Sequence, residues 1–155
     1  MILYLGTSSI AKLYVQEPGS DMLRIWTREA EIVATSRIAY TEMMSALDRR
    51  RKAHDLSPGD YDRIAKRFSS DWAHFVKVDF DDFEAGKMVR KYGLKRFGAI
   101  HLSAAKLLRE EARRVIPALR TVYHEQKDIA LFFSSGDRAL CSAASSEGLI
   151  ILPLT

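Results

Sequence analysis

What this sequence lacks limits its chemistry before any motif is considered. It has one cysteine, Cys141, so it can form no internal disulfide and offers no cysteine spacing of the kind that binds zinc. A chain without disulfides fits a reducing compartment, and we expect the cytoplasm. No apolar run approaches the roughly 20 residues of a membrane span, and the short apolar opening lacks the basic leader and cleavage site of a signal peptide. We therefore expect no membrane segment.

Glycine and proline are also scarce, with 8 and 4 residues. They form no flexible linker, no repeat and no G-x-G-x-x-G or G-x-x-x-x-G-K loop, which excludes the common glycine-rich phosphate cradles. We therefore predict a single domain over residues 1–155. What is present is ordinary for a globular protein, with 47% hydrophobic and 28% charged residues. The net charge of +4 is compatible with a nucleic-acid partner without being specific for one.

Short apolar runs alternate with helical patterns along the chain. The runs predicted to be strands are Ile2–Leu5, Ile32–Thr35, Phe75–Val78, Ala130–Phe133 and Leu149–Leu152. Amphipathic or capped segments predict helices over 8–15, 21–29, 37–53, 57–72, 81–92, from 98 onward, and over 137–145. Pro117 is expected to end or kink the helix that starts at 98, and Leu119–Asp128 fits either a helical extension or a surface insertion. The alternation predicts an α/β fold in which helices cover both faces of a central, mainly parallel sheet.

Acidic side chains are missing at two places where such a fold usually carries chemistry, beyond the carboxyl ends of its strands. The first strand runs into Gly6, and a second glycine, Gly98, opens a predicted helix. Two acids remain in matching contexts, Glu42 near the start of a helix and Asp137 just after the fourth strand. Because Gly6 and Asp137 both follow strands of one parallel sheet, we expect them at the same edge.

Taken singly, these polar residues have ordinary explanations. Glu42 has an ordinary explanation as an exposed glutamate on a solvated helix face. Asp137 lies at a predicted helix start, which favours a capping role for it. The hydroxyls of Thr7, Ser8 and Ser135 fit helix capping and hydrogen bonding to a ligand equally well. The pattern therefore leaves both alternatives open at these positions.

Three further features favour structural roles. His101 lies among apolar helix residues, which is more typical of a satisfied core histidine than of a general base. The run Asp48–Lys52 favours a solvated helix end whose cations suit the helix dipole, with contact to RNA phosphates as the less favoured alternative. Trp26 and Trp72 lie at apolar helical spacing and are predicted to be core or interface residues.

Four segments spread over nearly the whole chain together resemble the PIN-domain ribonuclease toxins of VapBC-type toxin–antitoxin modules. They are Met1–Tyr14, Ser36–Leu47, Phe97–Ala105 and Phe133–Leu140. That family carries an acid in each segment. This chain matches it at Glu42 and at Asp137, with Ser135 as the accompanying hydroxyl, but has Gly6 and Gly98 at the other two positions.

The resemblance implies a PIN-like three-layer α/β/α fold and the toxin of a type II toxin–antitoxin module. It implies an RNA substrate, hydrolysis of RNA phosphodiesters with Mg²⁺ or Mn²⁺, a VapB-like protein antitoxin and a homodimer. The metal positions would be Glu42, Asp137, Gly6 and Gly98, and the catalytic positions these four with Ser135. Since both glycines offer only backbone groups, we expect weak or absent metal binding and an attenuated or inactive enzyme.

Two other interpretations deserve comparison. A catalytically silent PIN-domain protein would bind RNA or an antitoxin without cleavage, and an RNA cleavage assay with Mn²⁺ separates it from an attenuated ribonuclease. A flavodoxin-like receiver domain needs an acid directly after its first strand, where this chain has Gly6. The sequence therefore favours the toxin-type nuclease over the receiver domain.

Overall fold

The computed structural model describes residues 1–123 and 130–154. For residue 116 and residues 118–123 it describes the backbone and not the side chains. Its centre is a parallel five-stranded sheet in the order β3-β2-β1-β4-β5. The strands are β1 (Ile2–Leu5), β2 (Ile32–Ser36), β3 (Val76–Val78), β4 (Leu131–Ser134) and β5 (Ile150–Ile151). All five lie within one or two residues of the runs predicted from the sequence.

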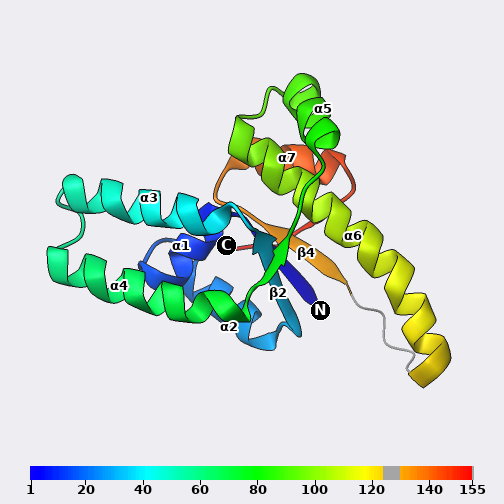
Figure 1. Cartoon of the computed structure of the whole chain (residues 1–155), viewed down its shortest axis with the longest axis horizontal. Coiled ribbons are helices and arrows are strands. Elements are labelled where there is room, and N and C mark those ends of the chain that lie inside the picture. Colours follow the sequence, from blue (N-terminus) through cyan, green and yellow to red (C-terminus); the bar gives the residue numbers. More distant parts are fainter. Residues whose placement is uncertain (124–129, 155) are drawn as a thin grey trace.

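Eight helical segments surround this sheet in the described part of the chain. They are α1 (Thr7–Tyr14), α2 (Ser20–Glu29), α3 (Ala39–Lys52), α4 (Pro58–Asp71), the 3-10 segment η1 (Trp72–His74), α5 (Asp82–Tyr92), α6 (Arg96–Tyr123) and α7 (Arg138–Ser146). Helices α1 to α4 lie on one side of the sheet, and α5 to α7 lie on the other (Figure 1). The expected three-layer α/β/α fold is therefore confirmed.

The central strand β1 supplies both halves of the core, because successive side chains of a strand point to opposite faces. Leu3 and Leu5 pack with residues of α1 to α4, including Ile10 and Met43. Tyr4 packs on the other face with residues of α5 to α7. Burial on both faces explains why β1 is a continuous apolar run.

Two helix starts follow directly from the sequence. Ser57 caps α4, since its Oγ accepts a hydrogen bond from the Asp60 N–H at 3.1 Å, and Pro58 follows at the first helical position. Asp81 caps α5 in the same way by accepting from the Glu84 N–H at 2.7 Å. No helix among the described residues has the length and apolarity needed to cross a membrane.

The structure corrects the sequence prediction for α6. Pro117 does not end this helix, which continues to Tyr123 with the exposed proline inside it. Gly98 does not open the helix but is its third residue. The first residues of the stretch Leu119–Asp128 are therefore helical, and residues 124–129 lie outside the described part.

The predictions for the two tryptophans agree with the structure in part. Trp72 belongs to η1 rather than to α4, but both tryptophans are partly buried against the core as predicted. Cys141 is partly buried. Its thiol donates a hydrogen bond to the Ser135 carbonyl at 3.3 Å.

Candidate functional site

Backbone pairing brings the predicted site positions to the carboxyl edge of the sheet. Strand β1 lies between β2 and β4, so the residues that follow these three strands are neighbours. The Gly6 N–H donates to the Ser134 carbonyl at 2.9 Å, which joins the end of β1 to the end of β4. Helix α1 begins directly after Gly6, and α3 begins three residues after β2. The expected shared edge is therefore present.

Glu42 lies in the first turn of α3 with its carboxylate turned toward α1. Its Oε1 accepts a hydrogen bond from Thr7 Oγ1 at 2.8 Å and lies 2.8 Å from His101 Nε2. Its side chain is 19% exposed. The expectation of a solvated surface glutamate is wrong, because two polar partners compensate for the partial burial of this carboxylate.

His101 joins Glu42 to the central strand. The ring is buried, and its Nδ1 lies 2.9 Å from the Tyr4 hydroxyl. Donation from Nε2–H to the carboxylate leaves Nδ1 as the acceptor for the Tyr4 O–H, so one neutral tautomer satisfies both contacts. The prediction of a satisfied core histidine is confirmed. Burial, together with the charge of Glu42, raises the pKa of Tyr4 well above its ordinary value.

Asp137 has the structural role that its position favours. It is the capping residue of α7, where its Oδ1 accepts a hydrogen bond from the Leu140 N–H at 3.1 Å. Ser135 Oγ in turn accepts from the Asp137 N–H at 3.1 Å and lies 3.2 Å from Ser8 Oγ. These contacts hold the turn between β4 and α7 against the start of α1.

Gly6 lies beside this network, whereas Gly98 faces the side chain of Leu140 on α7. Gly6 is the capping position of α1 and makes no side-chain bond there, and a Cβ atom built on it would lie 3.5 Å from Ser135 Oγ. A Cβ atom built on Gly98 would lie 3.8 Å from Leu140, the residue that Asp137 caps. Both distances are ordinary van der Waals contacts. Each position therefore has room for a Cβ atom.

The residues present do not fit a Mg²⁺ ion. Across residues 1–123 and 130–154, no group of three or more His, Cys, Asp or Glu side chains is arranged to hold a metal. Mg²⁺ favours oxygen ligands in near-octahedral geometry, whereas a Glu42 oxygen is already shared by Thr7 and His101. Asp137 and Glu42 are the two carboxylates at the four predicted metal positions, and the metal assignment stays a prediction.

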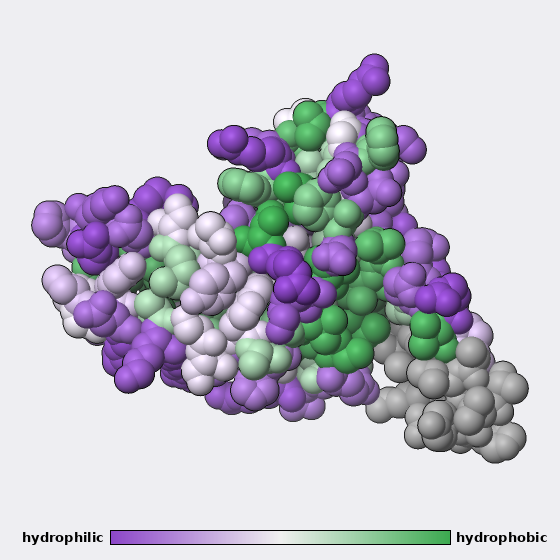
Figure 2. All heavy atoms as spheres, in the orientation of Figure 1, coloured by the Kyte–Doolittle hydropathy of each residue, from purple (hydrophilic) through white to green (hydrophobic). Residues whose placement is uncertain are grey.

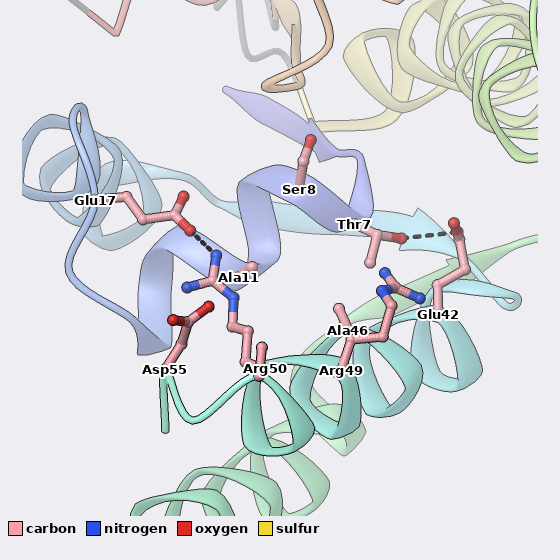
Figure 3. A pocket seen from close by; sticks show the side chains of 10 residues that line it. Thr7, Ser8, Ala11, Glu17, Glu42, Ala46, Arg49, Arg50 and Asp55 are labelled. Carbon is pink, nitrogen blue, oxygen red and sulfur yellow. Dashed lines mark hydrogen bonds and ion pairs between the residues drawn. The ribbon is translucent and has the colours of Figure 1, made fainter. Parts of the chain in front are cut away.

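A hollow of about 480 Å³ lies between α1 and α3 beside Glu42. Figure 3 shows Thr7 and Ser8 on one wall, with Glu42, Arg49 and Arg50 on the other. At its far end, Arg50 and Lys12 pair with Glu17. Burial of Glu17 opposes ionisation, but hydrogen bonds from Lys12 and Arg50 lower its pKa.

The basic run at the end of α3 has mixed roles. Arg51 and Lys52 pair with Asp48 on the helix surface, as expected of a solvated helix end. Arg50 pairs with Glu17 across the hollow. Arg49 makes a hydrogen bond to Ser45 Oγ at 3.0 Å and no ion pair with any described residue. It is therefore the cation of this run most available to a ligand.

Sequence reasoning did not identify the role of Tyr4. Its position inside a continuous apolar strand indicates burial, and a buried phenol needs a hydrogen-bond partner. That requirement was a usable signal, but it does not reveal which partner lies opposite. Here the partner is His101, 97 residues away in the sequence.

Comparisons with known proteins agree with this architecture. No protein-family model matches the chain. A relative named Ribonuclease VapC46, from Mycobacterium tuberculosis strain H37Rv, is 32% identical over 106 residues, 68% of this chain and 75% of the relative. Ribonuclease VapC49 of the same strain and Ribonuclease VapC45 of strain CDC 1551 are each 26% identical over 107 residues, 67% of this chain and 74% of each relative.

A solved structure supports the fold. The crystal structure of FitAcB from Neisseria gonorrhoeae matches with a TM-score of 0.59 at 15% identity, covering 99% of this chain and 98% of that one. At this identity the match bears on the fold alone. The parallel sheet flanked by helices, together with 32% identity to a named ribonuclease over two thirds of the sequence, shows that this chain belongs to the VapC family of PIN-domain toxins.

Proposed function

We propose that this chain is the toxin-type component of a two-protein VapBC module and that its RNA-hydrolysing site is attenuated. The observation that carries the proposal is the state of the carboxylates at the sheet edge. Glu42 is bound by Thr7 and His101, and Asp137 caps α7. Residues 6 and 98, where the resemblance expects acids, are glycines.

Metal-assisted phosphodiester hydrolysis needs a divalent ion that activates water and offsets the charge developing on the phosphate. Clustered carboxylates supply that ion with ligands and with a compensating negative field. Here Glu42 is hydrogen-bonded to His101 and Asp137 caps α7. These two acids supply fewer ligands and a weaker negative field than the four acids of the family pattern. We therefore expect weak Mg²⁺ affinity and slow or absent cleavage, with RNA binding retained through the basic residues beside Glu42.

The glycines are not needed for the backbone conformation at these positions. Gly6 has a φ of −69° and a ψ of 161°, which any residue adopts. Gly19 differs, because its φ is +88° and a Cβ atom there would lie 3.1 Å from Leu154. A Cβ atom at position 6 meets only ordinary van der Waals contacts, and aspartate is a usual capping residue at a helix start. The lost acids therefore affect chemistry more than folding.

The module also predicts protein partners. A VapB-like antitoxin is expected to cover the groove beside Glu42, and a homodimer is the expected assembly of the toxin. We place both in the cytoplasm. The apolar residues of α1 and α3 are mostly core, since Ile10 and Met43 are fully buried and Leu13, Tyr14 and Met44 pack against the same cluster. Light scattering of the purified chain, alone and with its antitoxin, tests these assemblies.

The decisive experiment compares this chain with its Gly6→Asp, Gly98→Asp double variant. Both proteins are incubated with a labelled RNA in Mg²⁺, in Mn²⁺ and in EDTA. Cleavage by the double variant alone, abolished by EDTA, is the expected result. Equal metal-dependent cleavage by the unmodified chain would contradict attenuation. Cleavage by neither protein, with RNA binding retained by both, would favour the silent RNA-binding alternative.

A cellular assay tests the module itself. Expression of the double variant is expected to arrest growth, and expression of a neighbouring antitoxin gene is expected to relieve that arrest. The unmodified chain should arrest growth weakly or not at all. Arrest that no antitoxin relieves would argue against the toxin–antitoxin assignment.

A further inference from the structure

A second hollow adjoins the candidate site on the other side of α3. It measures about 450 Å³ and is lined by Ile38, Thr41, Glu42, Ser45, Arg49 and Phe97. Small-molecule sites commonly measure about 300 to 1,000 Å³. Glu42 and Arg49 line this hollow and also the one between α1 and α3. The two hollows therefore meet at the candidate site.

The wall opposite α3 is an aromatic ring at the start of α6. Phe97 is 43% exposed although it is a large apolar residue. The guanidinium of Arg96 lies over it, 5.3 Å from the ring centroid. In Figure 2, hydrophobic side chains gather in the hollowed region between α3 and the end of the molecule that carries α5. Arg96 lies over one face of this ring, and the exposed part of the ring offers a surface on which a base can stack.

The charges around this ring have one predominant sign. Lys95 and Arg96 are exposed at the start of α6, where the helix dipole adds partial positive charge. Arg49 stands on the facing wall and makes no ion pair with any described residue. Glu42 is the acid of the lining, and it is already hydrogen-bonded to Thr7 and His101. The hollow thus combines an apolar, aromatic interior with a basic rim.

We propose that this hollow binds one unstacked base of a single-stranded RNA, with the base lying on Phe97 and the adjoining phosphates near Arg49 and Arg96. Aromatic stacking surfaces within basic grooves are how proteins hold single-stranded nucleic acids. A duplex keeps its bases stacked and presents no free base face to the ring. The inference rests on the proposed function and adds to it the hollow and the aromatic residue that position the RNA.

Phe97 is a positioning residue in this scheme. A base held on its ring places the neighbouring phosphodiester over the wall formed by Glu42 and Arg49, between the two hollows. The ring itself takes no part in bond breaking. Its loss is therefore expected to weaken RNA binding, whichever metal chemistry the site retains.

The test measures equilibrium binding of a fluorescein-labelled 12-nucleotide RNA to the full chain in EDTA, which suppresses cleavage. Phe97→Ala is expected to weaken binding about 5- to 150-fold, the range that corresponds to the loss of one base–aromatic stack. Phe97→Trp should retain affinity, and its indole fluorescence should be quenched when RNA binds. Phe83→Ala is the matched control, because Phe83 is an exposed phenylalanine on α5 that does not line the hollow.

A second set of measurements varies the RNA instead of the protein. RNAs with a single abasic nucleotide at successive positions are compared on the unmodified chain and on Phe97→Ala. The unmodified chain should lose affinity most at one position, and the variant should not distinguish that position. Duplex RNA of the same sequence should bind more weakly and should be insensitive to Phe97.

The outcomes separate this inference from the function on which it rests. RNA binding that is equal for the unmodified chain, Phe97→Ala and Phe83→Ala overturns the stacking site and leaves the toxin assignment standing. Loss of antitoxin binding with unchanged RNA binding in Phe97→Ala would assign the hollow to a protein partner and overturn the inference. Absence of RNA binding by every variant overturns both the stacking site and the RNA-binding part of the proposed function.

Discussion

Three side chains near the carboxyl edge of the sheet form a chain of polar contacts that runs from the surface into the core. Glu42 contacts His101, and His101 contacts Tyr4, which is fully buried. Buried polar groups are costly when they lack partners. In this chain they satisfy one another. The same network therefore engages one oxygen, Oε1, of the Glu42 carboxylate that a metal site would need.

The Tyr4 hydroxyl should contribute measurably to stability. Tyr4→Phe removes the donor to His101 Nδ1 and is expected to lower the free energy of unfolding by about 1 to 2 kcal/mol. Because burial raises the pKa of Tyr4, this contribution is complete below its ordinary pKa of 10 and declines as the pH rises above it. Urea unfolding at neutral pH and at alkaline pH measures both effects.

Tyr61→Phe is the control for this substitution. The Tyr61 hydroxyl makes no hydrogen bond to any described residue, although its ring lies under Arg51. Its loss should change stability by no more than a few tenths of a kcal/mol. Equal effects of the two substitutions would show that the contact between Tyr4 and His101 contributes nothing.

The restored acids should link stability to metal. Gly6→Asp with Gly98→Asp introduces carboxylates at the two positions that the family resemblance groups with Glu42 and Asp137, so we expect a lower melting temperature without metal because like charges repel. Mg²⁺ should then raise the melting temperature, since an ion that binds only the folded state stabilises it. The unmodified chain should show little or no Mg²⁺-dependent shift. Differential scanning fluorimetry with and without Mg²⁺ measures this.

Two other glycines supply a matched control for added charge. Gly59 and Gly86 lie in α4 and α5, and a Cβ atom at either would meet nothing within 4 Å. The double variant Gly59→Asp, Gly86→Asp adds the same two charges away from Glu42. A Mg²⁺-dependent shift of similar size in this control would mean that nonspecific charge, and not a restored site, explains the result.

At the scale of elements, one ionic cluster joins the helices on the α5–α7 side. Glu147, just after α7, accepts from Lys106 of α6 at 2.6 Å and from Lys91 of α5 at 2.8 Å. Tyr92 of α5 donates to the same carboxylate. Hydrogen bonds from Lys106, Lys91 and Tyr92 lower the pKa of Glu147 from 4.5 to about 2. This single carboxylate therefore ties α5 and α6 to the end of α7.

Glu147→Gln should weaken this junction and change the acid stability of the protein. Because the folded-state pKa is lowered, the stabilisation is present above pH 4.5 and is lost as the pH falls toward 2. Its size is at most about 3 kcal/mol. Unfolding at pH 7 and pH 3 should show a larger loss of stability for Glu147→Gln at pH 7 than at pH 3. Glu29 is an exposed glutamate of α2 without an ion pair to any described residue. Glu29→Gln should therefore leave the stability unchanged at both pH values.

Predictability also differs between elements. Strand β1 was predicted residue for residue, because an apolar run followed by a helix start has few alternatives. The end of α6 was not, because a proline disfavours a helix interior but does not exclude it when surrounding contacts support the helix. Gly98 was placed at a helix start although two helical residues precede it, which reflects the uncertainty of helix boundaries read from sequence.

For the whole molecule, connectivity predicted more of the site than residue type did. The shared edge of Gly6 and Asp137 follows from the parallel sheet, and the structure agrees. The partners of Glu42 were not predicted, since Thr7 and His101 reach it from α1 and α6 across 35 and 59 residues of sequence. Such contacts depend on how the helices pack on the two faces of the sheet, which a pattern in one segment does not encode.

The chain carries a net charge of +4, and its RNA binding should weaken as the salt concentration rises. Each phosphate that a cation neutralises on a single strand contributes about −0.7 to the slope of log K against log salt concentration. Arg49→Gln should therefore make that slope shallower by about 0.7, if Arg49 contacts one phosphate. Phe97→Ala should weaken binding at every salt concentration and leave the slope unchanged, because stacking releases no counterions.

Lys66→Gln is the control, since Lys66 is exposed on α4 and lines neither hollow beside Glu42. A slope that changes equally for Arg49→Gln and Lys66→Gln would mean that the overall positive charge of the protein attracts RNA without a defined path, whereas a change confined to Arg49 would locate the strand at the wall between the two hollows.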